Sequence, residues 1–102
     1  GILDSDTKVI LQAEPQDSEG FVDYALSIEG VEIGILLEQL SLGKLKGSLR
    51  AHDPVFALHQ LAQRFGGGGH PCAAGFTVNA NLEHFYAPFL EGLQAHLGGR
   101  TL

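Results

Sequence analysis

Four consecutive glycines, Gly66–Gly69, constrain this chain more than any other feature of its sequence. They lie between a segment of helical periodicity and a strand-like segment, 73–78, so we expect them inside a folded unit. Glycine is favoured where φ must be positive or where another group approaches the backbone closely, and successive glycine amides can form a concave nest for an anion. His70 follows directly and can donate to the same anion. The run therefore predicts a phosphate site.

A second interpretation treats the run as a flexible connector and His70 as a solvated loop residue. The small residues Ala73 and Ala74 favour the binding interpretation, because they are expected where the backbone passes close to another group. The run is not a P-loop, because GxxxxGK[ST] is absent, and it is not a dinucleotide fingerprint, because the glycines follow a helix rather than a strand. Both interpretations stay open from the residues alone.

The composition indicates one folded domain. The chain has 102 residues, 44% of them hydrophobic and 18% charged, which is enough for one core and too little for two. Its apolar stretches are a few residues long, far below the roughly 20 that cross a bilayer. The single cysteine, Cys72, cannot form an internal disulfide and is typical of a reducing compartment. We expect a cytoplasmic protein that has no membrane partner.

The few basic residues are concentrated on one predicted strand. The net charge is −6, with 12 acidic and 6 basic residues, so diffuse attraction of long duplex nucleic acid is excluded and any phosphate must be bound locally. Lys44, Lys46, Ser48 and Arg50 alternate with apolar residues and share one face. We interpret the two lysines as protection of an exposed sheet edge. Arg50 is the better phosphate ligand, because a guanidinium binds such oxygens in a bidentate fork.

The remaining histidines and the aspartates do not predict a metal or catalytic centre. HExxH is absent, one cysteine cannot build a zinc site, and no Asp-His-His cluster is visible. Neither a general acid/base pair nor a two-metal centre is therefore expected in this chain. The scattered residues are His52, His59, His84 and His96, and Asp4, Asp6, Asp17, Asp23 and Asp53.

Four segments are typical of strands, and two of them, 31–37 and 44–51, show alternating polarity. Residues 8–12, 31–37, 44–51 and 73–78 are the expected strands, with a polar turn at Glu14–Ser18 and a hairpin turn at Ser41–Gly43. With three helices, the order is β-α-β-β-α-β-α. This order predicts an α/β domain, with α+β as the alternative, in which a mixed sheet of about four strands packs with about three helices.

Apolar residues at helical spacing predict the three helices. The first ends at Gly30. The second begins at Asp53–Pro54, because aspartate caps free amides and proline is tolerated at the first helical position, and it ends at Gly66. The third is capped by Asn81, and Pro88 is expected to kink it or displace its start. The apolar stripes are, in chain order, Phe21, Ala25 and Ile28 with Tyr24 beside them; Leu58, Leu61, Ala62 and Phe65, which are expected to be buried; and Leu82, Phe85, Tyr86, Phe89, Leu90, Leu93 and Leu97.

The segment FGGGGHPCAAGF, from Phe65 to Phe76, closely resembles the hallmark of the DHH-associated domain, type 1, in which a GGGGH segment precedes a small-residue AAGF strand. The stretches EGFVDYALSIEGVEIGILLEQ and KGSLRA agree with it, so the resemblance covers roughly residues 18–97. It is strongest to bacterial oligoribonuclease/phosphatases of the nano-RNase type. The Pro71-Cys72 pair after the histidine and the first twenty residues depart from the pattern.

This resemblance implies a single substrate-binding domain, 1–102, cut from a longer protein and not catalytic by itself. A separate DHH domain of the same protein would hold two manganese ions, and the present domain would hold no cofactor. The implied substrates are short single-stranded oligoribonucleotides (nanoRNA), 3'-phosphoadenosine 5'-phosphate and cyclic-dinucleotide products, and a homodimer of the full-length protein is compatible with it. The implied substrate contacts are Gly67, Gly68, Gly69, His70 and Arg50, with Ser48 as a weaker one.

Two other functions stay open. The same domain occurs in single-strand exonucleases, and a standalone interaction domain with a purely structural glycine loop would also fit. A further relative is found in alanyl-tRNA synthetase, where an arginine tends to replace the histidine, so His70 favours the phosphoesterase branch.

Overall fold

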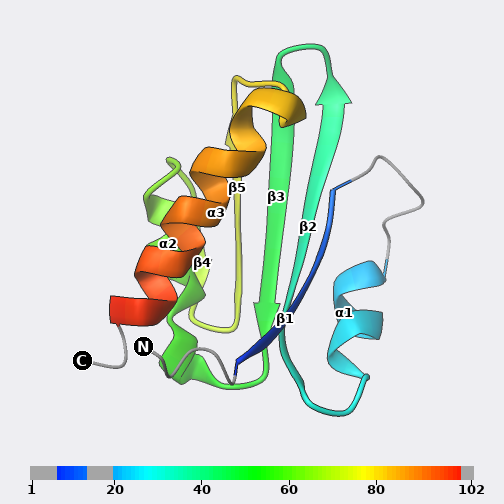
Figure 1. Ribbon diagram of the computed structural model, residues 1–102, viewed down its shortest axis with the longest axis vertical. Coiled ribbons are helices and arrows are strands. Elements are labelled where there is room, and N and C mark those ends of the chain that lie inside the picture. Colours follow the sequence, from blue (N-terminus) through cyan, green and yellow to red (C-terminus); the bar gives the residue numbers. More distant parts are fainter. Residues whose placement is uncertain (1–6, 14–19, 100–102) are drawn as a thin grey trace.

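The computed structural model describes residues 7–13 and 20–99 (Figure 1). The expected polar turn at Glu14–Ser18, together with Asp4, Asp6 and Asp17, lies outside these residues. The mixed α/β class expected from the sequence is confirmed. In chain order the elements are β1 (Lys8–Gln12), α1 (Phe21–Leu26), β2 (Val31–Ser41), β3 (Lys44–Ala51), a 3₁₀ helix (Pro54–Phe56), α2 (Leu58–Gln63), β4 (Gly68–His70), β5 (Ala73–Val78) and α3 (Leu82–Gly99).

The five strands form one mixed sheet in the order β1-β2-β3-β5-β4. β1 runs parallel to β2, whereas every other neighbouring pair is antiparallel. β2 is longer than expected and ends at Ser41, where Leu42-Gly43 makes the tight turn into β3. β3 therefore lies in the middle of the sheet, with a hydrogen-bonded neighbour on each side.

One face of the sheet carries the hydrophobic core. Alternate residues of β2, β3 and β5 point to this inner face and pack against α2 and α3, which lie on the same side (Figure 1). Four phenylalanine rings, from β5, α3 and the turn after α2, meet there, and the distances between their centroids are 5.2 to 5.9 Å. Each fully buried side chain of this size contributes about 1.5–3 kcal/mol. Central members of the core are Ile33, Ile35, Leu37, Leu45, Leu49, Leu58, Leu61, Phe76, Phe85, Phe89, Leu93 and Leu97.

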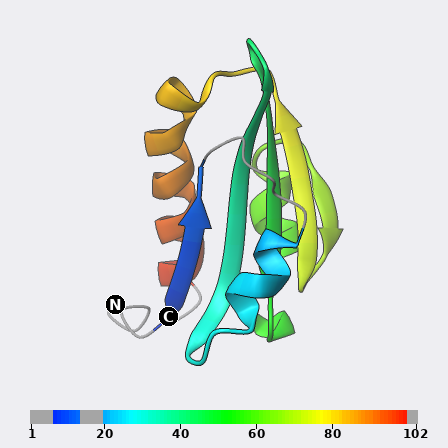
Figure 2. The same ribbon diagram turned by 90° about the vertical axis from the view of Figure 1, so that its right-hand side faces the viewer.

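The opposite, outer face is covered only in part. Gly34 lies directly beneath α1, since a methyl group there would be 3.1 Å from the Val22 carbonyl oxygen and 3.2 Å from the Ala25 side chain. Gly34 alternates with the buried Ile33 and Ile35, so α1 and α3 lie on opposite faces; Figure 2 shows α3 along one side of the strands. Over β3, β5 and β4 the outer-face residues are exposed or half-buried. This part of the sheet is the open surface of the domain.

The first two helices differ from the expected ones. α1 ends at Leu26, so the prediction that the helix runs to Gly30 is wrong; Ile28 lies beyond the helix, in the turn that leads to Gly30. The helix buries Val22 and Ala25 and half-buries Phe21, whereas Tyr24 is 65% and Ile28 37% exposed.

The second predicted helix is split in two. Asp53 caps as expected, because its carboxylate accepts from the Val55 amide at 2.9 Å, but the turn that follows is 3₁₀. Ala57 then adopts the left-handed conformation (φ 48°), which costs roughly 1–2 kcal/mol for a residue with a side chain. The Leu58 amide, at the start of α2, donates to the Pro71 carbonyl at 2.9 Å. A contact distant in sequence therefore accompanies the break.

The cap of α3 comes from another element. Asn81 does not cap its own helix: its side-chain oxygen accepts from the Gly43 amide at 2.6 Å, and the Leu82 amide donates to Oε1 of Gln39 at 2.6 Å. Pro88 lies inside α3 and does not displace its start. The predicted stripe is confirmed for Phe85, Phe89, Leu93 and Leu97, with Leu82 and Leu90 partly buried, but Tyr86 is 39% exposed. No helix in residues 7–13 and 20–99 is long and apolar enough to span a bilayer.

Gln39 should be the most important polar side chain for the stability of this end of the domain. Its Oε1 accepts from the Leu82 amide, and its Nε2 shares its two N–H donors among the carbonyls of Ser41, Lys44 and Ala80. The side chain thus joins the β2–β3 turn to α3. Gln39→Ala is expected to lower the free energy of unfolding by about 1–2 kcal/mol. Urea denaturation measures this change in the free energy of unfolding. Gln60→Ala, at an exposed position on α2, is the matched control. Equal unfolding midpoints for the two variants would contradict this role.

Candidate phosphate-binding site

Arg50 and His70 lie in one row across the outer face. Arg50 pairs with Ala73 in the β3–β5 ladder, and Ala73 pairs with His70 in the β4–β5 ladder. Residues directly opposite one another in antiparallel strands point to the same face. Arg50 and His70 therefore flank the small Ala73 at a Cα separation of about 10 Å, two strand spacings. The structure brings together two residues that the sequence places on separate elements.

The neighbouring row is made of small residues. Ser48 pairs with Gly75, and Gly75 pairs with Gly68. A hollow of about 370 Å³ lies along this part of the sheet, lined among others by Arg50, Ser48, Gly75 and Lys46. Its volume lies near the lower end of the range for small-molecule sites. The hollow meets the row at Arg50, which belongs to both, whereas Ala73 and His70 are not among the residues that line it.

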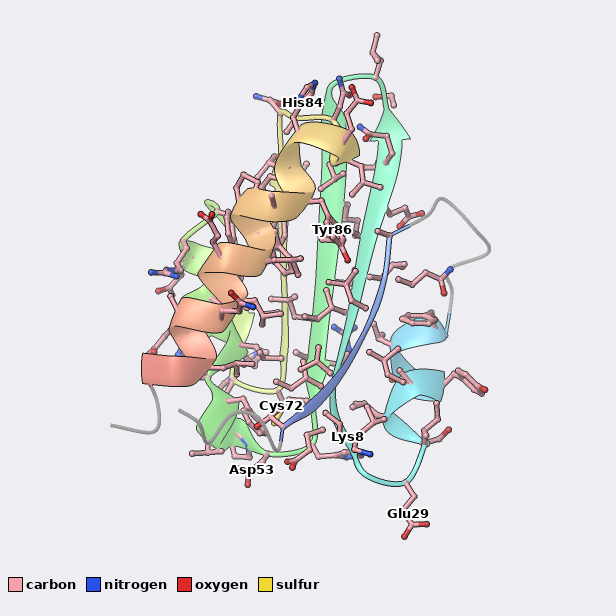
Figure 3. All side chains as sticks on the ribbon, in the orientation of Figure 1. Lys8, Glu29, Asp53, Cys72, His84 and Tyr86 are labelled. Carbon is pink, nitrogen blue, oxygen red and sulfur yellow. The ribbon has the colours of Figure 1, made fainter. Side chains whose placement is uncertain are left out.

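The turn that carries His70 is anchored on both sides. The Pro71 carbonyl accepts from the Leu58 amide at 2.9 Å, and the Cys72 carbonyl accepts from the Ala51 amide at 3.0 Å. The second bond ties the β4–β5 turn to the residue that follows Arg50. Figure 3 shows Cys72 and Asp53 at the same end of the molecule, where β3 ends and β5 begins. The Pro71-Cys72 pair thus fixes the position of His70 relative to Arg50.

The second half of the glycine run belongs to a strand, and the members of the run serve different purposes. Gly68 and Gly69 lie in the edge strand β4 (Gly68–His70), whereas Gly66 and Gly67 precede it, so a flexible connector does not describe the run. The anion nest stays a prediction. A side chain at Gly67 would overlap the Gly75 carbonyl, and one at Gly69 would lie 2.6 Å from the Ala73 carbonyl. A methyl group added at Gly68 would meet no atom within 4 Å, and Gly68 has no left-handed φ. Its missing side chain therefore has no structural explanation, and it faces the open surface beside Gly75.

The interpretation of the lysines is wrong. β3 lies between β2 and β5, so Lys44 and Lys46 protect no sheet edge. They share the outer face with Ser48 and Arg50, as predicted from the alternation. The Arg50 guanidinium donates to the Leu49 carbonyl at 3.1 Å, which uses one of its five N–H donors. A positive stripe on a central strand needs a different physical reason from edge protection.

The other histidines hold elements together or lie elsewhere. The His52 ring contacts the Leu26 carbonyl at 2.8 Å, and the His96 ring contacts the Phe56 carbonyl at 2.6 Å. Nε2 of His84 lies 3.2 Å from Oε2 of Glu83. This pair is near the β2–β3 turn, and His84 is at the end of the molecule opposite Cys72 (Figure 3). Within the described part of the chain, no three His, Cys, Asp or Glu side chains are grouped to hold a metal ion.

Sequence reasoning missed two residues of this surface. It gave Lys46 a protective role and did not consider Thr77, which pairs with Lys46 on the outer face. The alternation of 73–78 already puts Thr77 on one face with Ala73 and Gly75. The register between β3 and β5 was needed to place it beside Lys46.

Residues 7–95 match the DHHA1 domain. The chain belongs to the DHHA1 domain family. It is also 34% identical over 83 residues to the bifunctional oligoribonuclease and PAP phosphatase NrnA of Thermus thermophilus, a match that covers 80% of this chain and 25% of that protein. The DHHA1 domain thus spans about a quarter of this relative's length, and the family resemblance expected from the glycine segment is confirmed.

Solved structures share the DHHA1 fold. An exopolyphosphatase-related protein from Bacteroides fragilis superposes with a TM-score of 0.74 and 28% identity, over 97% of this chain and 32% of that one. The C-Ala domain of Aquifex aeolicus alanyl-tRNA synthetase gives 0.67 and 12% identity, over 90% and 92%. At such low identity, the second likeness concerns the fold alone.

Two alanine substitutions should separate structural from functional glycines in the run. Gly67→Ala forces a methyl group onto the Gly75 backbone and should destabilise the DHHA1 domain by about 1–3 kcal/mol. Gly68→Ala meets open space and should leave stability within about 0.5 kcal/mol or raise it slightly. Thermal unfolding measures both. If Gly68→Ala were as destabilising as Gly67→Ala, the run would be structural throughout.

Proposed function

We propose that this DHHA1 domain binds the phosphate end of a short oligoribonucleotide or nucleotide on the outer face of β3, β5 and β4. The ligand is then presented to a separate DHH domain of the same protein, which hydrolyses it with two manganese ions. The observation that supports the proposal most is the row Arg50–Ala73–His70, in which two phosphate-binding side chains stand on either side of a small one.

The chemistry of the row suits a phosphate. Arg50 can offer a fork of two N–H donors to two oxygens, and the His70 ring can donate to a third. Ala73, Gly75 and Gly68 keep the floor between them low, so phosphate oxygens can approach the sheet closely. Ser48, beside Gly75, can add a hydroxyl donor. In a chain of net charge −6, such a local site is what phosphate binding requires.

The relatives support the reaction class. The NrnA protein of Thermus thermophilus is named an oligoribonuclease and PAP phosphatase, and both activities hydrolyse a phosphate-ester bond. In the proposal, the DHHA1 domain supplies binding and orientation, and the bond is broken in the DHH domain. A module for long single strands would instead stack bases on aromatic side chains. Among the row residues and the two small residues beside them, Gly75 and Gly68, His70 carries the single aromatic ring and no Phe, Tyr or Trp stands next to it, which favours a grip on phosphate.

Substitution of the two row residues tests this proposal in the complete protein. Arg50→Ala and His70→Ala each remove a donor to a charged oxygen, so kcat/KM for 3'-phosphoadenosine 5'-phosphate and for short oligoribonucleotides should fall roughly 10- to 100-fold, about 1.5–3 kcal/mol. Gly68→Ala should also lower kcat/KM, because its methyl group narrows the surface, although folding tolerates it.

Lys44→Ala is the matched control for this series. Lys44 is exposed at the start of β3, three alternate positions away from Arg50, and its loss should change kcat/KM less than about twofold. The proposal fails if activity is indifferent to Arg50 and His70 while the melting temperature falls.

A further inference from the structure

We infer that Lys46 and Thr77, which pair across β3 and β5 at the far side of the hollow from Arg50, form a second anion subsite for a second phosphate group of the same ligand. This inference rests on the proposed function, because it assumes that Arg50 and His70 bind the first phosphate, which in a dinucleotide is the one that joins the two nucleosides; Lys46 and Thr77 then bind the terminal 5'-phosphate. It assigns a role to the part of the positive stripe that edge protection does not explain.

The two ends of the hollow carry the charges. Lys46 and Arg50 both line it, and they are four residues apart on one strand, about 13 Å between Cα atoms. Ser48 and Gly75 lie between them, and these are small and uncharged. The site therefore has cationic side chains at its two ends and a neutral floor in its middle.

Thr77 strengthens the assignment of the second subsite. It is exposed, lines the hollow and is the direct cross-strand partner of Lys46. A lysine ammonium acts as a point charge toward phosphate, and a threonine hydroxyl can donate to an oxygen of the same group. The pair thus offers both charge and a directed hydrogen bond.

Glu38 gives Lys46 another neighbour. It lies opposite Lys46 in the β2–β3 ladder, on the other side from Thr77. An opposite-charge pair across two strands stabilises a sheet only weakly. That pair would explain the charge of Lys46, but it would not explain why Thr77 and the hollow lie on the other side of the lysine. The test below separates these two roles.

The arrangement selects a class of ligand. Two anion subsites joined by a neutral floor fit two phosphate groups that are separated by one nucleoside. A nucleoside 3',5'-bisphosphate and a 5'-phosphorylated dinucleotide have this chemistry, whereas a dinucleotide without a terminal phosphate has only one group to offer. We therefore expect the complete protein to prefer the phosphorylated form.

The experiment compares two substrates in the complete, manganese-loaded protein: a diadenosine dinucleotide with a 5'-phosphate and the same dinucleotide without it. The unmodified protein should show a higher kcat/KM for the phosphorylated substrate. Lys46→Ala should lower kcat/KM roughly fivefold to tenfold for that substrate only, which abolishes the preference. Thr77→Val should reduce the preference less, and Lys46→Arg, which keeps the charge, should retain it.

Two controls make the outcomes distinguishable. Lys44→Ala removes a charge from the same strand face and should leave the preference intact. Arg50→Ala should lower kcat/KM for both substrates. Suppose that Arg50→Ala has this effect, but that Lys46→Ala leaves the preference unchanged or lowers kcat/KM equally for both substrates. The assignment of the second subsite is then wrong, and the proposed function stands. If Arg50→Ala changes neither substrate, the proposed function itself fails.

Discussion

The close pairing of β3, β5 and β4 is the constraint on which the rest of this domain depends. Gly47 leaves room for the Phe76 ring above β3, and Gly67 lets the chain pass against the Gly75 carbonyl. These contacts hold the three strands in the register that places Arg50, Ala73 and His70 in one row. A shift of one residue in any pair would send one of these side chains to the opposite face. The proposed phosphate site thus depends on contacts within the backbone of the sheet.

The two faces of these strands have separate tasks. The inner face buries a single core in which rings from β5, α3 and the segment after α2 meet, and it contributes most of the stability. The outer face carries the positive and small residues and is left open beyond α1. Because alternate residues point to opposite faces, substitutions of Arg50 or Lys46 remove no core contact. Residues of the outer face can therefore change while the fold is kept.

Much of this architecture could be predicted from the sequence, and the remainder depended on contacts between distant residues. β1, β3 and β5 have the predicted bounds, because the apolar residues and the turns that delimit them are local properties of the sequence. β4 was missed, since two glycines and a histidine carry no strand pattern, and its pairing with β5 gives it order. The cap of α3 comes from Gln39, about forty residues away in the sequence. A capping rule that considers only neighbouring residues therefore predicted Asn81 instead. Arg50 and His70 were proposed from their chemistry and lie in one row, whereas Lys46 was misjudged because edge and centre cannot be distinguished without strand order.

A crystal structure of the complete protein with a bound nucleoside 3',5'-bisphosphate, prepared without manganese, would test the central claim most directly. The account predicts one phosphate within hydrogen-bonding distance of both the Arg50 guanidinium and the His70 ring, above Ala73 on the outer face of the sheet. A ligand bound elsewhere, with the Arg50–Ala73–His70 row facing solvent, would contradict it.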